Sequence, residues 1–281
     1  MKENIEIGQT REFGDIIGDT FIFLRQNFLP LLNAYFVICG AFLIVGILAS
    51  LMFDSDQSQT TFADLFSFNG IFGMLFSAAN YTSLVVTAFS YMSLYREKGN
   101  QSPDVKEVWG YVKYFYFRVF GAQLVLVIVI AIATMLCFFP GVYLFPIFSL
   151  IVPIMIMENT NLEYAAKKAF KIIKENWWFA FGTVLLMCIM VVMAILVFMI
   201  PALLISSGGQ WLTGKNLDRS YVLVQSIVSY LTEALWLVPA ISVTLLYYTL
   251  IEAKDATSLT NRIKKFGASN TQSDDIISDE Y

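Results

Sequence analysis

Six apolar stretches, each long enough to cross a lipid bilayer, alternate with polar segments along the chain. As helices, stretches of about 20 residues match the roughly 30 Å hydrocarbon core of a bilayer. Paired in chain order, they predict three helical hairpins, at about residues 29–95, 118–157 and 177–251. The pattern therefore predicts an all-α integral membrane protein with six transmembrane helices, within a membrane domain that covers residues 1–252.

Three further segments place apolar residues every three or four positions, which is typical of a helix with one apolar face. These segments cover about residues 10–28, 102–117 and 160–176, and each leads into the first stretch of a hairpin. Thr160 and Glu163 have the spacing of a capping box at the start of the third segment. We expect all three to form amphipathic helices on the cytoplasmic surface of the membrane.

Proline and glycine indicate where two of the stretches end. Pro140 and Gly141 predict the outer turn of the second hairpin, and Pro201 predicts the end of the fifth stretch. Residues 253–281 are polar and acidic, so we expect a largely disordered cytoplasmic tail.

Basic residues are distributed very unevenly between the polar segments. Of the 18 Lys and Arg residues, all but Lys215 and Arg219 lie in segments that share one side of the membrane. Cytoplasmic loops hold the excess of basic residues in multi-pass membrane proteins. The asymmetry therefore predicts that both termini are cytoplasmic.

The basic residues of the surface segments are candidates for binding anionic lipid headgroups. The candidates are Lys167, Lys168, Lys171, Lys174, Lys113 and Arg25. The alternative is that these residues only determine the topology, because basic residues flank most membrane helices.

The three surface segments also align with one another without gaps, from Thr20, Val108 and Ala169. An aromatic, a basic and a second aromatic residue recur at the same positions of the alignment. Three copies that enter from one side would be parallel repeats around an axis along the membrane normal. The alternative is that every helix at this interface needs these residue types.

Four polar residues within the apolar stretches are candidate site residues, because polar groups at membrane depth are costly and frequently functional. These candidates for buried polar residues are Asn80, Glu233, Asn33 and Gln123. Counting about 20 residues back from the inner end of the sixth stretch places its outer boundary near Leu231. Glu233 is then expected near the outer surface, and hydrogen bonding between helices is the structural alternative for the amides.

Composition excludes several function classes. Charged residues make up 14% of the chain, well below the roughly 25% of soluble domains. Histidine, the most common acid–base group and metal ligand, is absent from the sequence. The three cysteines, Cys39, Cys137 and Cys188, lie in apolar stretches without metal-ligand spacing. We expect no metal, no other cofactor and no nucleic-acid partner, and an enzyme that works through Glu233 is the least favoured hypothesis.

The region from residue 140 to residue 186 carries a loose motif of prolines, aromatic residues and an acidic residue. The matching positions are Pro140, Gly141, Tyr143, Leu144, Pro153, Glu158, Ala166 and Trp177. The motif resembles the bacterial glycerophosphodiester phosphodiesterase membrane-domain family and related uncharacterised six-helix inner-membrane proteins. The resemblance implies a location in the bacterial inner membrane. It implies no catalytic residue, because catalysis in fused members belongs to a separate soluble domain.

Two functional hypotheses follow. The first is a non-catalytic scaffold or lipid-associated module, whose partners are membrane lipids, another protein or a second copy of the chain. The alternative is a transporter or channel for a small or amphipathic substrate. The transporter predicts a water-accessible cavity at Asn80, whereas the scaffold predicts a closed apolar core there.

Overall fold

The computed structural model describes residues 5, 7–52, 67–136, 138–213 and 219–254, and these ranges contain helices and no strands. Six helices are long and apolar enough to span a membrane, as the sequence pattern predicts. These spans are Phe13–Ala49, Asn69–Glu97, Val105–Leu136, Phe138–Met157, Trp177–Pro201 and Ser226–Lys254. The chain is therefore a multi-pass helical membrane protein.

The elements follow one another in a simple order. They are α1 (Phe13–Met52), α2 (Phe68–Glu97), α3 (Val105–Leu136), α4 (Phe138–Met157), α5 (Leu162–Ile173), α6 (Trp177–Thr213) and α7 (Arg219–Glu233). A short 3-10 turn over Ala234–Trp236 then joins α7 to a helix over residues 237–254. The expected tail, from residue 255 on, lies outside the described residues.

The three surface segments join their membrane spans in three different ways. In α1 the backbone leaves helical geometry at Asn27 (φ −111°, ψ 16°), three residues before Pro30, whose ring conflicts with a regular helix. The second segment has no such break, because α3 is continuous from Val105 to Leu136. The third segment is a separate helix, α5, and a short turn divides it from α6.

The starts of α3 and α5 rely on polar caps. The backbone N–H of Asp104 donates to Glu107 Oε2 at 2.8 Å, and this contact satisfies a group that the helix leaves free. Asn161 Oδ1 accepts from the backbone of Tyr164 at 3.0 Å and caps α5. The capping residue is thus Asn161, one position after the predicted Thr160.

Neither proline signal marks a helix end. Pro140 and Gly141 lie in the first turn of α4, not in the predicted loop. A proline is tolerated there because the first backbone N–H groups of a helix have no acceptor within it. Pro201 lies inside α6, which continues to Thr213. Proline inside a membrane helix is tolerated when neighbouring groups satisfy the freed carbonyl.

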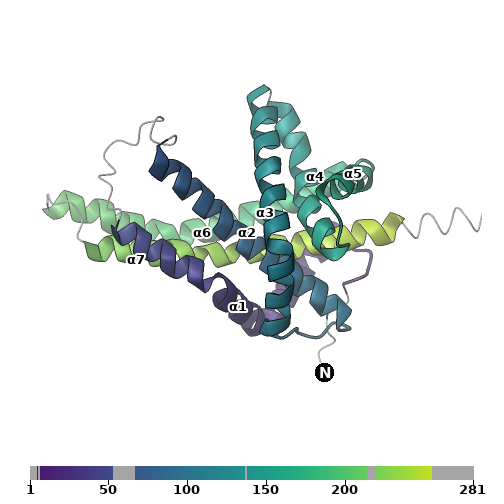
Figure 1. Ribbon diagram of the computed structural model, residues 1–281, viewed down its shortest axis with the longest axis horizontal. Coiled ribbons are helices and arrows are strands. Elements are labelled where there is room, and N and C mark those ends of the chain that lie inside the picture. Colours follow the sequence, from purple (N-terminus) through teal and green to yellow (C-terminus); the bar gives the residue numbers. More distant parts are fainter. Residues whose placement is uncertain (1–4, 6, 53–66, 137, 214–218, 255–281) are drawn as a thin grey trace, which may run out of the picture.

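The α3–α4 hairpin forms an arm that projects from the rest of the bundle (Figure 1). The arm lies across the direction in which α6, α7 and helix 237–254 run. Helix α2 passes between the arm and the other helices, and it contacts α1, α3 and α4. The predicted parallel arrangement of three hairpins is therefore not confirmed.

Burial differs strongly between the spans. Helix 237–254 and the second half of α2 form the centre of the core. There the Phe23 ring of α1 packs edge-on against the Tyr95 ring, with 4.9 Å between the ring centres. The α3 span is the least buried of the six, and its Phe117 and Leu136 are each 81% exposed. Because such apolar surface is stable only in hydrocarbon, lipid is the expected surroundings of the arm.

Candidate functional site

A cavity of about 650 Å³ lies where the α3–α4 arm meets α2, α6 and the helix that begins after Trp236. Among its lining residues are Val85, Phe120, Val127, Phe148, Val184 and Pro239. We call this cavity the groove. Its volume falls within the roughly 300–1,000 Å³ range of small-molecule sites.

Three polar side chains in the groove wall, those of Thr82, Gln123 and Ser149, bind each other or the backbone. The Thr82 hydroxyl bonds to the side-chain oxygen of Gln123, which links α2 to α3. Ser149 donates to the carbonyl of Pro146 at 2.8 Å within α4. Because these groups are already paired, the wall presents an almost entirely apolar surface to whatever fills it.

Asn80 and Glu233 meet directly, although the sequence suggested them as separate candidates. Asn80 Nδ2 donates to Glu233 Oε2 at 2.6 Å, and the Asn80 side chain is only 4% exposed. Glu233 is half-buried at the end of α7. Ala78 and Tyr81 of α2 line the groove, whereas Asn80 lies on another side of the same helix and is not among the lining residues.

The other two polar candidates have different surroundings. Gln123 is half-buried and faces the groove as the partner of Thr82. Asn33 is exposed, so the expectation that it is buried is wrong. The buried face of α1 at this level contains Ala34 and Tyr35, and Asn33 lies outside it.

The six basic candidates divide into residues with a side-chain partner and residues without an ion pair. Lys167 binds Glu163 at 2.6 Å, Lys168 binds Glu158, and Lys113 lies 5.3 Å from the centre of the Trp109 ring. The hydrogen bond from Lys167 lowers the pKa of the Glu163 carboxyl. The remaining three, Arg25, Lys171 and Lys174, are exposed and form no ion pair within the described part of the chain.

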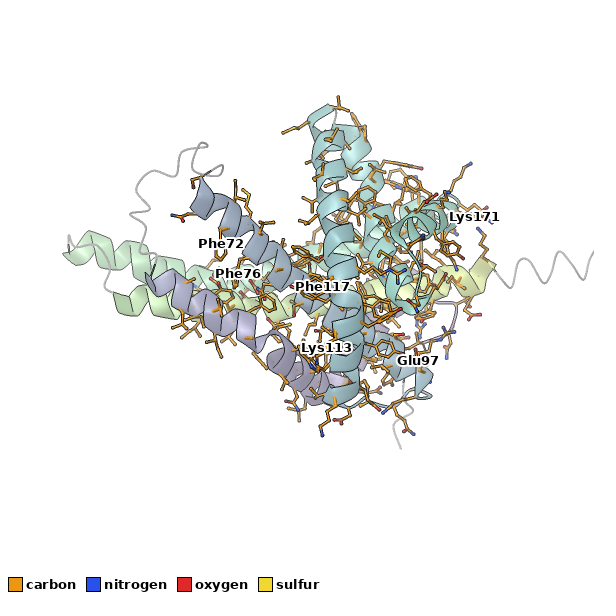
Figure 2. The ribbon with its side chains drawn as sticks, in the orientation of Figure 1. Phe72, Phe76, Glu97, Lys113, Phe117 and Lys171 are labelled. Carbon is orange, nitrogen blue, oxygen red and sulfur yellow. The ribbon has the colours of Figure 1, made fainter. Side chains whose placement is uncertain are left out.

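Two glutamates at the ends of spans join neighbouring helices. Glu97 accepts from the Tyr111 hydroxyl of α3 at 2.8 Å, and Glu158 binds both Lys168 and Tyr247. Figure 2 shows Glu97 and Lys171 on the side of the molecule away from Phe72 and Phe76. The sequence showed glutamates at these span ends, but the two tyrosine partners carry no local signal.

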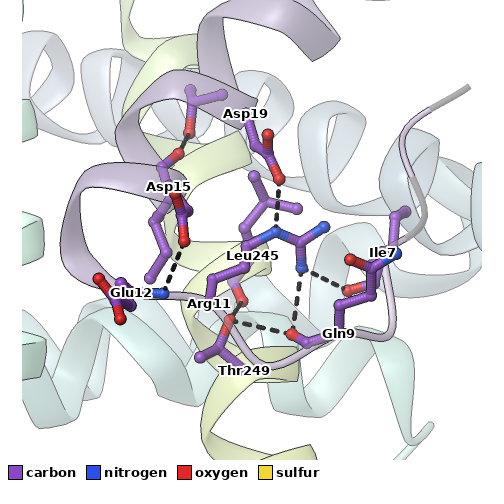
Figure 3. A network of polar contacts seen from close by, with 10 residues as sticks. Ile7, Gln9, Arg11, Glu12, Asp15, Asp19, Leu245 and Thr249 are labelled. Carbon is purple, nitrogen blue, oxygen red and sulfur yellow. Dashed lines mark hydrogen bonds and ion pairs between the residues drawn. The ribbon is translucent and has the colours of Figure 1, made fainter. Parts of the chain in front are cut away.

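A second polar network holds the segment before α1 against helix 237–254 (Figure 3). Arg11 Nε donates to Asp19 at 2.7 Å, and a terminal nitrogen of the same guanidinium donates to the Ile7 carbonyl at 2.9 Å. Thr249 donates to the Gln9 carbonyl at 3.4 Å. Arg11 is only 8% exposed. It therefore has a structural role that the topology argument does not predict.

The described residues contain no cluster of acidic or sulfur side chains suited to a metal ion. No family of known proteins, no curated protein and no solved structure matches the chain. The resemblance to the glycerophosphodiester phosphodiesterase membrane domain stays a prediction, and the groove with its neighbouring polar contacts is the candidate site.

Proposed function

We propose that the protein is a non-catalytic, lipid-associated membrane protein that holds the hydrocarbon chain of a membrane lipid in the groove. The observation that carries the proposal is an apolar cavity of about 650 Å³ between the α3–α4 arm and the other spans. An empty cavity forfeits dispersion contacts along its whole lining. Water gains little there because the wall is mostly apolar and its Thr82, Gln123 and Ser149 side chains already bind protein groups. Hydrocarbon from the surrounding bilayer satisfies both conditions.

Charged groups at the helix ends support binding of an anionic headgroup. Lys171 and Lys174 project from the exposed face of α5, whereas Ala165 and Ala169 on the opposite face are buried. Basic residues at a membrane surface attract anionic lipids. We also propose a bacterial inner-membrane location with both termini in the cytoplasm, supported by the resemblance and by the distribution of Lys and Arg.

The position of the groove favours lipid binding over transport of a substrate through it. A transporter predicts a hydrated cavity that reaches Asn80, and Asn80 does not line this one. Asn80 instead donates its amide to Glu233. The groove is therefore better suited to hold an apolar chain than to pass a polar substrate.

Filling the groove tests the proposal. Val127→Trp places an indole in the cavity, whereas Val125→Trp changes an exposed valine of the same helix that does not line it. We expect Val127→Trp to lose at least one copurifying lipid, measured by native mass spectrometry of protein released from detergent. Equal lipid retention by the two variants and the unchanged protein would contradict the proposal.

A further inference from the structure

Buried polar side chains form a second feature of the core, separate from the groove. They lie between α1, α2 and the segment that begins at Glu233, and we call them the polar seam. Six of its members are Glu233, Asn80, Cys39, Thr87, Tyr91 and Asn27. Five of these six residues, all except Glu233, are less than 5% exposed. Polar groups are expensive at membrane depth, so a continuous row of them needs an explanation.

The register of the helices gives the seam its direction. Asn80 pairs with Glu233, and sixteen positions later Arg96 lies 4.3 Å from the ring centre of Tyr248, so α2 and helix 237–254 run parallel. Asn27 of α1 meets Tyr91 and the later Cys39 meets the earlier Ser83, so α1 runs antiparallel to α2. From Asn80 to Tyr91 the seam follows about 16 Å of helix, at 1.5 Å per residue. That length is about half of the hydrocarbon core.

Direct contacts join the seam at three levels. At one end, Asn80 binds Glu233 at 2.6 Å. In the middle, Cys39 Sγ lies 3.3 Å from Ser83 Oγ and 4.0 Å from Thr87 Oγ1. At the other end Asn27 Oδ1 accepts from the Tyr91 hydroxyl at 3.2 Å. It also accepts from Ser102 at 2.7 Å, beside the basic Lys98 and Lys106.

Three buried hydroxyls without a hydrogen-bond partner lie between these levels. Tyr35, Ser90 and Ser242 are at most 1% exposed, and their hydroxyl oxygens are unpaired. Tyr35 precedes Cys39 by one helical turn, and Ser90 lies between Thr87 and Tyr91. The parallel register places Ser242 at the depth of Ser90.

Other hydroxyls in the same helices show that this lack of a partner is specific. Thr87 donates to the Ser83 carbonyl at 2.7 Å, and Thr244 donates to the Ala240 carbonyl at 3.0 Å. Each of these hydroxyls thereby finds an acceptor in the backbone one turn earlier in its own helix. Buried polar groups without a protein partner are the usual sites of internal water. The unpaired hydroxyls lie where water would connect one level of the seam to the next.

We propose that internal water completes the polar seam and that the seam conducts protons between Glu233 and the basic side of the membrane. A relay needs groups that both donate and accept a hydrogen bond, and water and the hydroxyls of Tyr35, Ser90 and Tyr91 all do so. Glu233 supplies the carboxylate that takes up or releases the proton at the far end. Glu233 is half-buried, and the proposal requires its exposed part to face solvent on that side.

Proton flux into liposomes tests this proposal. The full chain is reconstituted with internal pyranine, and a potassium gradient with valinomycin supplies the driving potential. We expect flux several-fold above that of protein-free liposomes, abolished by Glu233→Gln and reduced several-fold by Ser90→Ala. Thr183→Val is the matched control, because the buried Thr183 hydroxyl bonds to the Phe179 carbonyl within α6, outside both the seam and the groove, and its flux should be unchanged. Flux equal to that of protein-free liposomes, or unaltered by Glu233→Gln, would overturn the proposal.

A second measurement needs no change within the seam. In a Cys137→Ser chain, hydroxyl radicals formed from water by X-rays oxidise side chains that have water beside them. Cys39 is fully buried in the seam, whereas half-buried Cys188 lines the apolar groove. We expect Cys39 to be oxidised several-fold faster than Cys188 despite its deeper burial. Oxidation of Cys39 at the same rate or more slowly would show that the seam is dry and would overturn the relay.

Discussion

Single polar residues in this protein connect helices that are distant in sequence. The Asn80 amide reaches Glu233 across 153 positions, and the Thr82 hydroxyl reaches Gln123 across 41. The sequence marks Asn80, Gln123 and Glu233 as exceptions in apolar stretches. It does not show which residues pair, because the depth of Glu233 depends on where its long apolar stretch enters the membrane.

A double-mutant cycle tests the Asn80–Glu233 contact. Asn80→Ala leaves the Glu233 carboxyl without its partner, and a buried polar group without a partner costs about 1–3 kcal/mol. We expect Asn80→Ala and Glu233→Ala each to lower the free energy of unfolding in detergent. The double variant should lose less than the sum of both, by about 0.5–3 kcal/mol. Additive losses would mean that the two side chains do not interact.

At the scale of whole elements, helix existence is easier to predict than helix ends. Apolar length alone identified the six spans, because every spanning helix needs the same amount of hydrocarbon contact. The helix ends predicted from Pro140 and Pro201 are wrong, because proline stops a helix only where its missing N–H or its ring is not accommodated. The cap at Asn161 was misplaced by one residue because Thr160 and Asn161 are both good capping residues.

Close packing of α1 against α7 depends on Gly46. A methyl group added at Gly46 would overlap the Tyr230 hydroxyl, whereas one added at Gly40, two turns earlier, would meet nothing within 4 Å. We expect Gly46→Ala to destabilise the protein by roughly 1–3 kcal/mol, the usual cost of overpacking. Thermal unfolding in detergent measures this effect, with Gly40→Ala as the control.

Shortening the tyrosine checks the cause of the Gly46 effect. Tyr230→Ala removes the ring that the added methyl group would overlap. The combination of Gly46→Ala with Tyr230→Ala should therefore cost less than the two separate changes together. A Gly46→Ala variant as stable as the Gly40→Ala control would show that α1 and α7 do not pack as described.

The exposed lysines of α5 give an electrostatic prediction. Lys171 and Lys174 have no acidic partner in the described part of the chain, whereas Lys167 is already paired with Glu163. Each free basic residue near an anionic membrane contributes about 1 kcal/mol of attraction. We expect the double change to Gln at 171 and 174 to reduce copurifying anionic lipid severalfold, measured by lipid mass spectrometry. Lys167→Gln should reduce copurifying anionic lipid less. An equal reduction by Lys167→Gln and by the double change would contradict the distinction between paired and unpaired lysines.

At the scale of the whole molecule, the α3–α4 arm explains why the groove escaped sequence analysis. Its lining comes from α2, α3, α4, α6 and the residues after Trp236. These residues are ordinary apolar residues such as Val85, Val127 and Phe148, which look in sequence like any lipid-facing or core position. Figure 1 shows that the arm runs across the other helices, and the groove lies where the two sets of helices meet.

The Arg11 network has a consequence for biosynthesis. The segment around Gln9 is synthesised well before Thr249, its partner in Figure 3, which lies 240 positions later in the chain. Until helix 237–254 has been inserted, the Gln9 carbonyl lacks the Thr249 hydroxyl as a partner, although Arg11 can already bind Ile7 and Asp19. Closure of this contact therefore requires that helix 237–254 is in place. We expect a chain truncated before residue 249 to leave the segment around Gln9 more accessible to added protease than the full chain does.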